Sequence, residues 1–144
     1  MRAKINSMYE IDNDICRLDF DVLEKWLSQT YWSQGISKEE IHKGAVNSTM
    51  VVGCYLGQEQ VGYMRLISDK IRFGYIMDVY VELNHRNKGI AQQMIRFALN
   101  NPELKNVYQW LLVTQDAHSV YSGIGFRPLP NPERWMMLNK EKVR

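Results

Sequence analysis

A short basic loop between a strand pattern and a helix pattern is the stretch of the sequence best suited to chemistry. It comprises Arg86, Asn87, Lys88, Gly89, Ile90 and Ala91. Backbone N–H groups at a helix N-terminus can bind an anion, and the helix dipole adds partial positive charge there. Gly89 and Ala91 are small enough to let phosphate oxygens approach the backbone, and Arg86 and Lys88 bring positive charge. The loop therefore favours a phosphate site, although an ordinary strand-to-helix turn with solvated cations fits the same residues.

Two segments at a fitting separation resemble the GCN5-related N-acetyltransferase (GNAT) superfamily. Residues 86–91 match its (Q/R)-x-x-G-x-(G/A) signature, and residues 117–126 are similar to its A-x-x-x-Y-x-x-x-G-F segment. Leu83 replaces the usual proline before the signature, and Thr114 or Asp116 stands near the position of a frequent asparagine. The resemblance extends well over about 50–126 and more loosely over the residues before it. The loop matches neither the P-loop nor the GxGxxG dinucleotide pattern.

The resemblance implies that the chain binds acetyl-CoA as its cofactor. Backbone groups of the central strand at Val79, Tyr80 and Val81 would bond the pantetheine arm as an added strand would. Residues 86–91 would hold the pyrophosphate, and Thr114 and His118 complete the implied cofactor-binding set. The central strand and the next parallel strand would splay apart to admit the thioester. No histidines or carboxylates have metal-ligand spacing, so no metal is expected.

The implied reaction is direct attack of an amine on acetyl-CoA, and it sets chemical requirements. An alkylammonium has a pKa near 10.4, so its neutral form costs about 4–5 kcal/mol at pH 7. Asp78 is the best acidic candidate for a base, and a structural carboxylate is the equal alternative. Tyr121 is the natural partner of the leaving thiolate, through a hydrogen bond or a concerted proton transfer. A tyrosine buried in the core is the alternative for that residue.

Aromatic residues predict where the acceptor binds. Tyr31 and Trp32 lie in the loop between the first two predicted helices, and Trp135 lies in the last predicted strand. Such side chains could bracket a cationic or apolar amine, or they could be core residues. The acceptor class that follows is an amine of a small molecule or a protein.

Composition narrows the range of partners and locations. The 144 residues fit one domain, 1–144, and a net charge of +2 gives no basic field for nucleic acid. No apolar stretch is long enough to cross a bilayer, and no apolar leader follows Met1. We therefore expect no nucleic-acid or membrane partner and a cytoplasmic location. Two cysteines are too few for a disulfide framework. A monomer or a homodimer is expected.

Hydrophobic periodicity predicts an α/β (α+β) fold with a mixed, mainly antiparallel sheet and helices on both faces. The strand–helix–strand pattern after residue 73 predicts that strands 73–81 and 108–114 are parallel and adjacent. The predicted strands are residues 8–11, 50–56, 60–67, 73–81, 107–114 and 135–138. The predicted helices are residues 18–27, 37–47, 89–99 and 117–122.

Two functions from different classes are compatible with these motifs. The first is an acetyl-CoA-dependent N-acetyltransferase acting through a ternary complex. The second is an acyl-CoA-binding sensor module of the same fold that does not catalyse transfer. Tyr121 favours the enzyme. A nucleic-acid-binding domain that uses the basic cluster at residues 85–88 is disfavoured by the near-neutral net charge.

Overall fold

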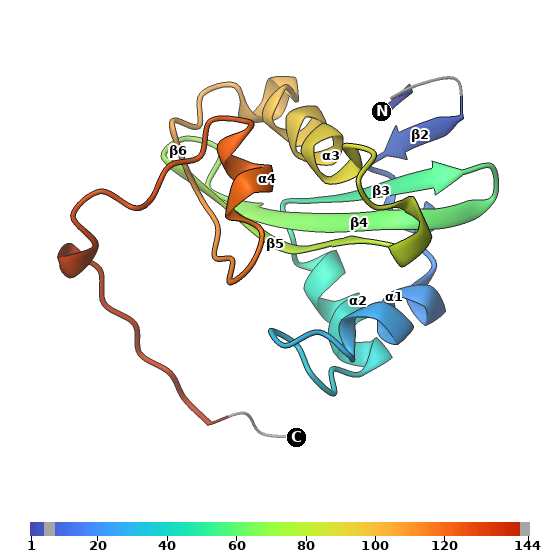
Figure 1. The fold of residues 1–144 in the computed structure, drawn as a ribbon, viewed down its shortest axis with the longest axis horizontal. Coiled ribbons are helices and arrows are strands. Elements are labelled where there is room, and N and C mark those ends of the chain that lie inside the picture. Colours follow the sequence, from blue (N-terminus) through green and yellow to red (C-terminus); the bar gives the residue numbers. More distant parts are fainter. Residues whose placement is uncertain (5–7, 142–144) are drawn as a thin grey trace.

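Six strands form one sheet in the order in which they occur along the chain (Figure 1), within residues 1–4 and 8–141 that the computed structural model describes. Every neighbouring pair is antiparallel except β5 and β6, which are parallel. The strands are β1 (Arg2–Lys4), β2 (Tyr9–Asp12), β3 (Met50–Leu56), β4 (Glu59–Ser68), β5 (Phe73–Val81) and β6 (Gln109–Leu111). The predicted mixed, mainly antiparallel sheet is thus confirmed.

Helices cover both faces of the sheet (Figure 1). α1 (Phe20–Leu27) and α2 (Lys38–Val46) lie on one face, and α3 (Ile90–Leu99) and the short α4 (His118–Ser122) lie on the other. The predicted capping box at the start of α2 is present, because Ser37 and Glu40 exchange side-chain to backbone hydrogen bonds. In the part of the chain that the structure describes, no helix combines the length and apolar composition of a membrane span.

The core consists of two clusters separated by the sheet. One lies under α3 and contains Val52 and Cys54, and the other lies under α1 and α2 and contains Val51. Successive residues of a strand point to opposite faces, so β3 supplies both clusters. This position explains why residues 50–56 form an unbroken apolar run rather than an alternating one.

The strand predicted at 135–138 is wrong, and the strand predicted at 107–114 is too long, although its parallel pairing with β5 is confirmed. The strand predicted at 107–114 is reduced to β6, and Tyr108 and Val113 at its ends are 73% and 77% exposed. No strand forms at 135–138 in the described residues, and that segment lies away from the sheet. β6 is short because its pairing with β5 ends at Tyr75 and Leu111, and residues 135–138 pair with no strand of the described sheet. The short β1 was not predicted.

Gly74 of β5 and Trp110 of β6 pack closely against each other near the start of the parallel pair. The two residues are partners in the register, and the indole occupies the space that a side chain at position 74 would need. A Cβ built on Gly74 would lie 2.3 Å from Cζ3 of Trp110. Trp110 also packs against the core under α3, so its ring cannot move aside freely.

We predict that Gly74→Ala lowers the free energy of unfolding by about 1–3 kcal/mol, the usual cost of overpacking. Chemical denaturation measures the change. Gly44→Ala in α2 is the control, because its new Cβ would meet the tip of Arg65 at an ordinary 3.4 Å. Alanine is favoured over glycine inside helices by up to about 1 kcal/mol, so this control should lose no stability. Equal losses in the two variants would contradict the proposed packing.

Candidate active site

The site arises where β5 and β6 part. Their register ends at the pair of Tyr75 and Leu111, yet β5 continues to Val81. The register with β4 shifts at the same point. Tyr80 pairs with Tyr63 and Met77 pairs with Arg65, so β5 has one more residue than β4 between these two pairs. Asp78 lies in this bulge with a φ of 55°, in the left-handed region that a residue with a side chain seldom adopts. The bulge redirects the second half of β5 just where its β6 partner is lost.

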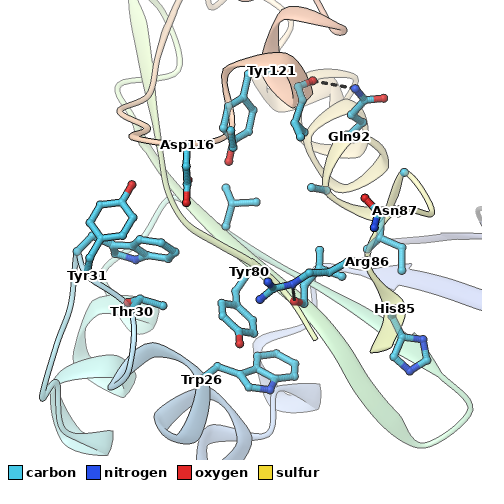
Figure 2. A pocket seen from close by; sticks show the side chains of 18 of the residues that line it. Trp26, Thr30, Tyr31, Tyr80, His85, Arg86, Asn87, Gln92, Asp116 and Tyr121 are labelled. Carbon is cyan, nitrogen blue, oxygen red and sulfur yellow. Dashed lines mark hydrogen bonds between the residues drawn. The ribbon is translucent and has the colours of Figure 1, made fainter. Parts of the chain in front are cut away.

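Two cavities meet at this opening, one of about 900 Å³ and one of about 550 Å³. The first cavity extends along β5 to the 86–91 loop, and Figure 2 shows Tyr121 directed into it. The second cavity extends past Asp78 to Tyr75 and Leu112. Both volumes suit small organic molecules. The residues common to the two linings are Tyr31, Trp32, Val79, Asp116, Ala117 and Tyr121.

The 86–91 loop has the backbone shape of an anion site. Asn87 and Gly89 are both left-handed, with φ of 63° and 77°. Gly89 caps α3 without any side-chain hydrogen bond from the described residues, so N–H groups of the first helical turn stay available. A Cβ at Gly89 would meet nothing within 4 Å, which leaves open space above these donors. These features fit a bound phosphate group.

The structure brings most of the predicted cofactor-binding residues together. Lys88 and His118 are exceptions, because both are exposed and line neither cavity. Thr114 lines the second cavity rather than the first, and its hydroxyl accepts a hydrogen bond from the Ala117 N–H at 3.0 Å. The predicted residues that line the first cavity are Val79, Tyr80, Val81, Arg86, Asn87, Gly89, Ile90 and Ala91.

Arg86 is folded back onto β5. Its Nε donates to the Val81 carbonyl at 2.8 Å, and its guanidinium lies 5.2 Å from the centre of the Tyr80 ring. Tyr80 in turn stacks on Trp26 of α1, with ring centres 5.0 Å apart. The arginine thus occupies part of the first cavity in this conformation (Figure 2).

Tyr121 stands between the cavities with a hydroxyl that can serve a ligand. Its ring is partly buried and meets Phe126 edge-on, at 6.3 Å between centres. Within the described chain the hydroxyl makes no hydrogen bond. Burial, with Tyr31 and Asp116 nearby, raises the pKa of Tyr121 to about 12. The side chain therefore stays protonated at neutral pH and can donate a hydrogen bond.

Asp78 connects two residues that line the second cavity, Arg65 and Trp32. Its carboxylate accepts from Arg65 Nε at 2.7 Å through one oxygen and from Trp32 Nε1 at 3.1 Å through the other. Both residues of the ion pair are largely buried. In addition, the Tyr31 hydroxyl accepts from the Gln115 N–H at 3.0 Å. The predicted aromatic pair is thus fixed in place by β5 and by the loop before α4.

Trp135 is not part of either cavity, contrary to the prediction for the acceptor site. It follows the turn at Pro132–Arg134, is 46% exposed, and lies on the segment that leaves the sheet. The prediction assumed a last strand packed beside the site, and that strand is absent. Met137, further along the same segment, does border the second cavity.

Some lining residues had not been predicted. Gln92 on α3 donates from Nε2 to the Val120 carbonyl at 2.8 Å and so joins α3 to α4 (Figure 2). His85 borders the first cavity, with Nδ1 2.7 Å from the Tyr9 hydroxyl. Both roles depend on contacts between segments far apart in the sequence. Across the described residues, no group of three histidines, cysteines or carboxylates could hold a metal ion.

Comparisons with known proteins define the class. Residues 47–128 match the model of the acetyltransferase (GNAT) domain. A structure from Xanthomonas campestris pv. campestris, a candidate acetyltransferase of the GNAT family, has a TM-score of 0.85 and 27% identity over 96% of both chains. A candidate acetyltransferase from Clostridium acetobutylicum, solved with acetyl-CoA, has a TM-score of 0.66 and 19% identity, again over 96% of both chains. The fold is that of an acetyltransferase.

The chain belongs to the GNAT acetyltransferase family, because the family model matches more than half of its residues. Sequence similarity also reaches FG08082, a candidate acetyltransferase of Gibberella zeae, with 36% identity over 73 residues. That match covers 48% of this chain and 40% of the Gibberella protein, so the similarity spans less than half of the relative's length.

We predict that Gly89→Asp abolishes measurable binding of coenzyme A, because its carboxylate would enter the space above the α3 N-terminus and repel a phosphate. Gly57→Asp is the matched control. Gly57 also has a positive φ, of 60°, and open space around its missing Cβ, but it lies on the β3–β4 turn away from the cavities. Calorimetry should give wild-type affinity for the control. Equal affinities in two folded variants would refute the phosphate site.

Proposed function

We propose that the protein transfers the acetyl group of acetyl-CoA to an amine of a small molecule or a protein, by direct attack in a ternary complex. The observation that carries the proposal is the pair of cavities that meet at Tyr121 and Val79. Two cavities with one junction suit two substrates that react where they touch. Membership of the acetyltransferase family and the anion-binding shape of the 86–91 loop support the same assignment.

In this proposal the first cavity takes coenzyme A, which supplies the thioester. The 86–91 loop holds the pyrophosphate with the N–H groups of α3, and β5 offers backbone groups at Val79 and Val81 to the pantetheine arm. Arg86 leaves the Val81 carbonyl and turns towards a phosphate. That movement exchanges a hydrogen bond to a neutral carbonyl for one to an anionic phosphate oxygen and frees a backbone acceptor on β5.

The second cavity takes the acceptor amine. The faces of Tyr31 and Trp32 attract an ammonium group, and Asp116 adds negative charge at the junction. We assign Asp78 a positioning role, because both of its oxygens already accept hydrogen bonds. Asp116 is exposed and borders both cavities, so it offers the amine's proton a path to water. An unperturbed alkylammonium needs such a path because its neutral form costs about 4–5 kcal/mol at pH 7.

Tyr121 assists the departure of the thiolate by donating a hydrogen bond. With a pKa raised to about 12, its proton is held more tightly than that of a thiol. Against a thiol pKa of about 8.5, full transfer would be uphill by roughly 5 kcal/mol. A hydrogen bond that strengthens as negative charge develops on sulfur therefore describes its role better than complete proton transfer.

The proposed activity is tested by thiol release from acetyl-CoA across a panel of amines, with calorimetry of coenzyme A binding on the same sample. We expect saturable binding and amine-dependent release for at least one class of amine. Binding without release for any amine would favour the acyl-CoA sensor instead. Absence of binding would overturn both assignments.

For the best amine, we predict that Tyr121→Phe lowers kcat by about 10²-fold or more, the low end of general-acid effects. Binding of coenzyme A and the melting temperature should change little, because the hydroxyl bonds nothing in the described chain and the ring is kept. Tyr108→Phe, just before β6, is the control, since Tyr108 is 73% exposed and lies outside both cavities. A kcat for Tyr121→Phe within about threefold of wild type would assign the tyrosine to packing alone.

The pH profile of the same reaction follows from the raised pKa. Tyr121 acts in its protonated form, which persists up to its pKa of about 12 and is lost only above it. The rate should therefore rise with pH as the amine loses its proton, with no fall caused by Tyr121 below about pH 11. Tyr121→Phe should lower the plateau without moving the rising limb. A falling limb that disappears in Tyr121→Phe would contradict this role.

A further inference from the structure

Most of the charge that lines the second cavity is already balanced by other groups of the domain. The charged side chains among its described lining residues are Glu40, Arg65, Asp78 and Asp116. Arg65 and Asp78 form a largely buried ion pair, with 2.7 Å between Nε and the carboxylate. Glu40 accepts a hydrogen bond from the Ser37 N–H at 3.1 Å and lies in the first turn of α2, where the helix dipole compensates its charge. These three charges therefore need no ligand.

Asp116 differs from the other three, because it makes no hydrogen bond or ion pair with the rest of the described chain. It is exposed and borders both cavities, so it lies at their junction. The rings of Tyr31 and Trp32 also border both cavities and meet edge-on, with 5.0 Å between their centres. One carboxylate beside two aromatic rings is a site for one ammonium group.

The lining that belongs to the second cavity alone is largely apolar. The hydroxyls of Ser33 and Thr114 are engaged with the Leu27 carbonyl and the Ala117 N–H. Tyr75 adds an aromatic ring with a neutral hydroxyl. The other side chains are Ile36, Ile76, Met77, Leu112, Val113 and Met137. In the described residues, this part of the cavity offers contacts to an apolar or aromatic body and no unbalanced carboxylate to a second ammonium group.

The course of β5 sets the length of the molecule that can lie in this cavity. Val79 borders both cavities, whereas Tyr75 borders only the second. The two residues are four positions apart on β5, and at about 3.3 Å per residue the path between them is on the order of 10 Å long. A small alkylamine or arylalkylamine has such a length, and the volume of about 550 Å³ suits a molecule of that size.

We propose that the second cavity selects small primary amines that carry one positive charge and an apolar or aromatic body. The ammonium group lies at Asp116, and the body lies along β5 towards Tyr75. This substrate class rests on the proposed function, in which the second cavity takes the acceptor amine. Polyamines and aminoglycosides are disfavoured, because their further ammonium groups would lose water without gaining a carboxylate partner.

Hexylamine and cadaverine are matched probes, because cadaverine has a second amino group where hexylamine has its terminal methyl group. Calorimetry with coenzyme A present gives the dissociation constant of each amine. We expect hexylamine to bind at least about tenfold more tightly, because cadaverine would bury an ammonium group without a partner. Equal or tighter binding of cadaverine, or no binding of hexylamine, would overturn the substrate class. Thiol release from acetyl-CoA on the same samples tests the transfer separately: selective binding without release would refute the proposed function and leave the selectivity of the cavity standing.

Two variants distinguish the two ends of the bound amine. Asp116→Asn should weaken both probes by the same factor, because it removes the partner of the ammonium group that they share. Val113→Asp should shift the ratio of the dissociation constants towards cadaverine by about threefold, within the range of an exposed ion pair, because Val113 is 77% exposed and borders the apolar part of the cavity. Ile71→Asp is the matched control.

Ile71 is 63% exposed, lies between β4 and β5, and borders neither cavity. Its added charge should leave the ratio within about twofold of wild type, because solvent and salt screen exposed charges at a distance. Equal shifts of the ratio in Val113→Asp and Ile71→Asp would contradict the proposed position of the amine's body. Unequal weakening of the two probes by Asp116→Asn would contradict the position of its ammonium group.

Discussion

The divergence of β5 from β6 is the constraint on which the site depends. Adjacent strands normally stay about 4.8 Å apart and satisfy each other's backbone groups. Here the pairing stops at Tyr75 and Leu111, held closed on one side by the indole of Trp110 over Gly74. Beyond that point the backbone of β5 on this side needs other partners. The fold thus leaves the second half of β5 without a β6 partner where the two cavities meet, and in the proposed function this part of the backbone binds the amide groups of coenzyme A.

The bulge at Asp78 places residues that line the opening between β5 and β6. A left-handed conformation of a non-glycine residue within a strand costs conformational free energy, so surrounding contacts must stabilise it. Arg65 from β4 and Trp32 from the α1–α2 loop both donate to the Asp78 carboxylate. Desolvating such a pair costs several kcal/mol per ion, and the extra donor from the indole helps to offset that cost. The loop that carries Tyr31 and Trp32 is therefore positioned by a charge pair in the sheet as well as by its own hydrogen bonds to the Leu27 carbonyl.

Local signals made the conformation of the 86–91 loop and most elements predictable from the sequence. A glycine before a helical pattern and the capping box at Ser37 act within a few residues, and the structure has both. The partners of Asp78 could not be predicted, because Arg65 pairs with it from the neighbouring strand β4 and Trp32 reaches it from the α1–α2 loop. The prediction for Trp135 failed because an apolar run forms a strand only where it pairs with the sheet, and residues 135–138 follow the turn at Pro132–Arg134 without pairing. The sequence contained no signal for the hydrogen bond from Gln92 to α4, since predicting it requires knowing where α4 lies.

The charges around Tyr121 decide which chemistry the junction can support. Both cations that line the cavities from β4 and the 86–91 loop, Arg65 and Arg86, are engaged with Asp78 and with the Val81 carbonyl. Little free positive charge is therefore directed at the junction, while Asp116 adds negative charge there. In the proposed transfer reaction, a thiolate formed in such surroundings would be stabilised by neutral donors, which act without the desolvation cost of a buried cation. A tyrosine whose burial keeps it protonated is suited to that task, and the same acidic surroundings favour the approach of a cationic amine.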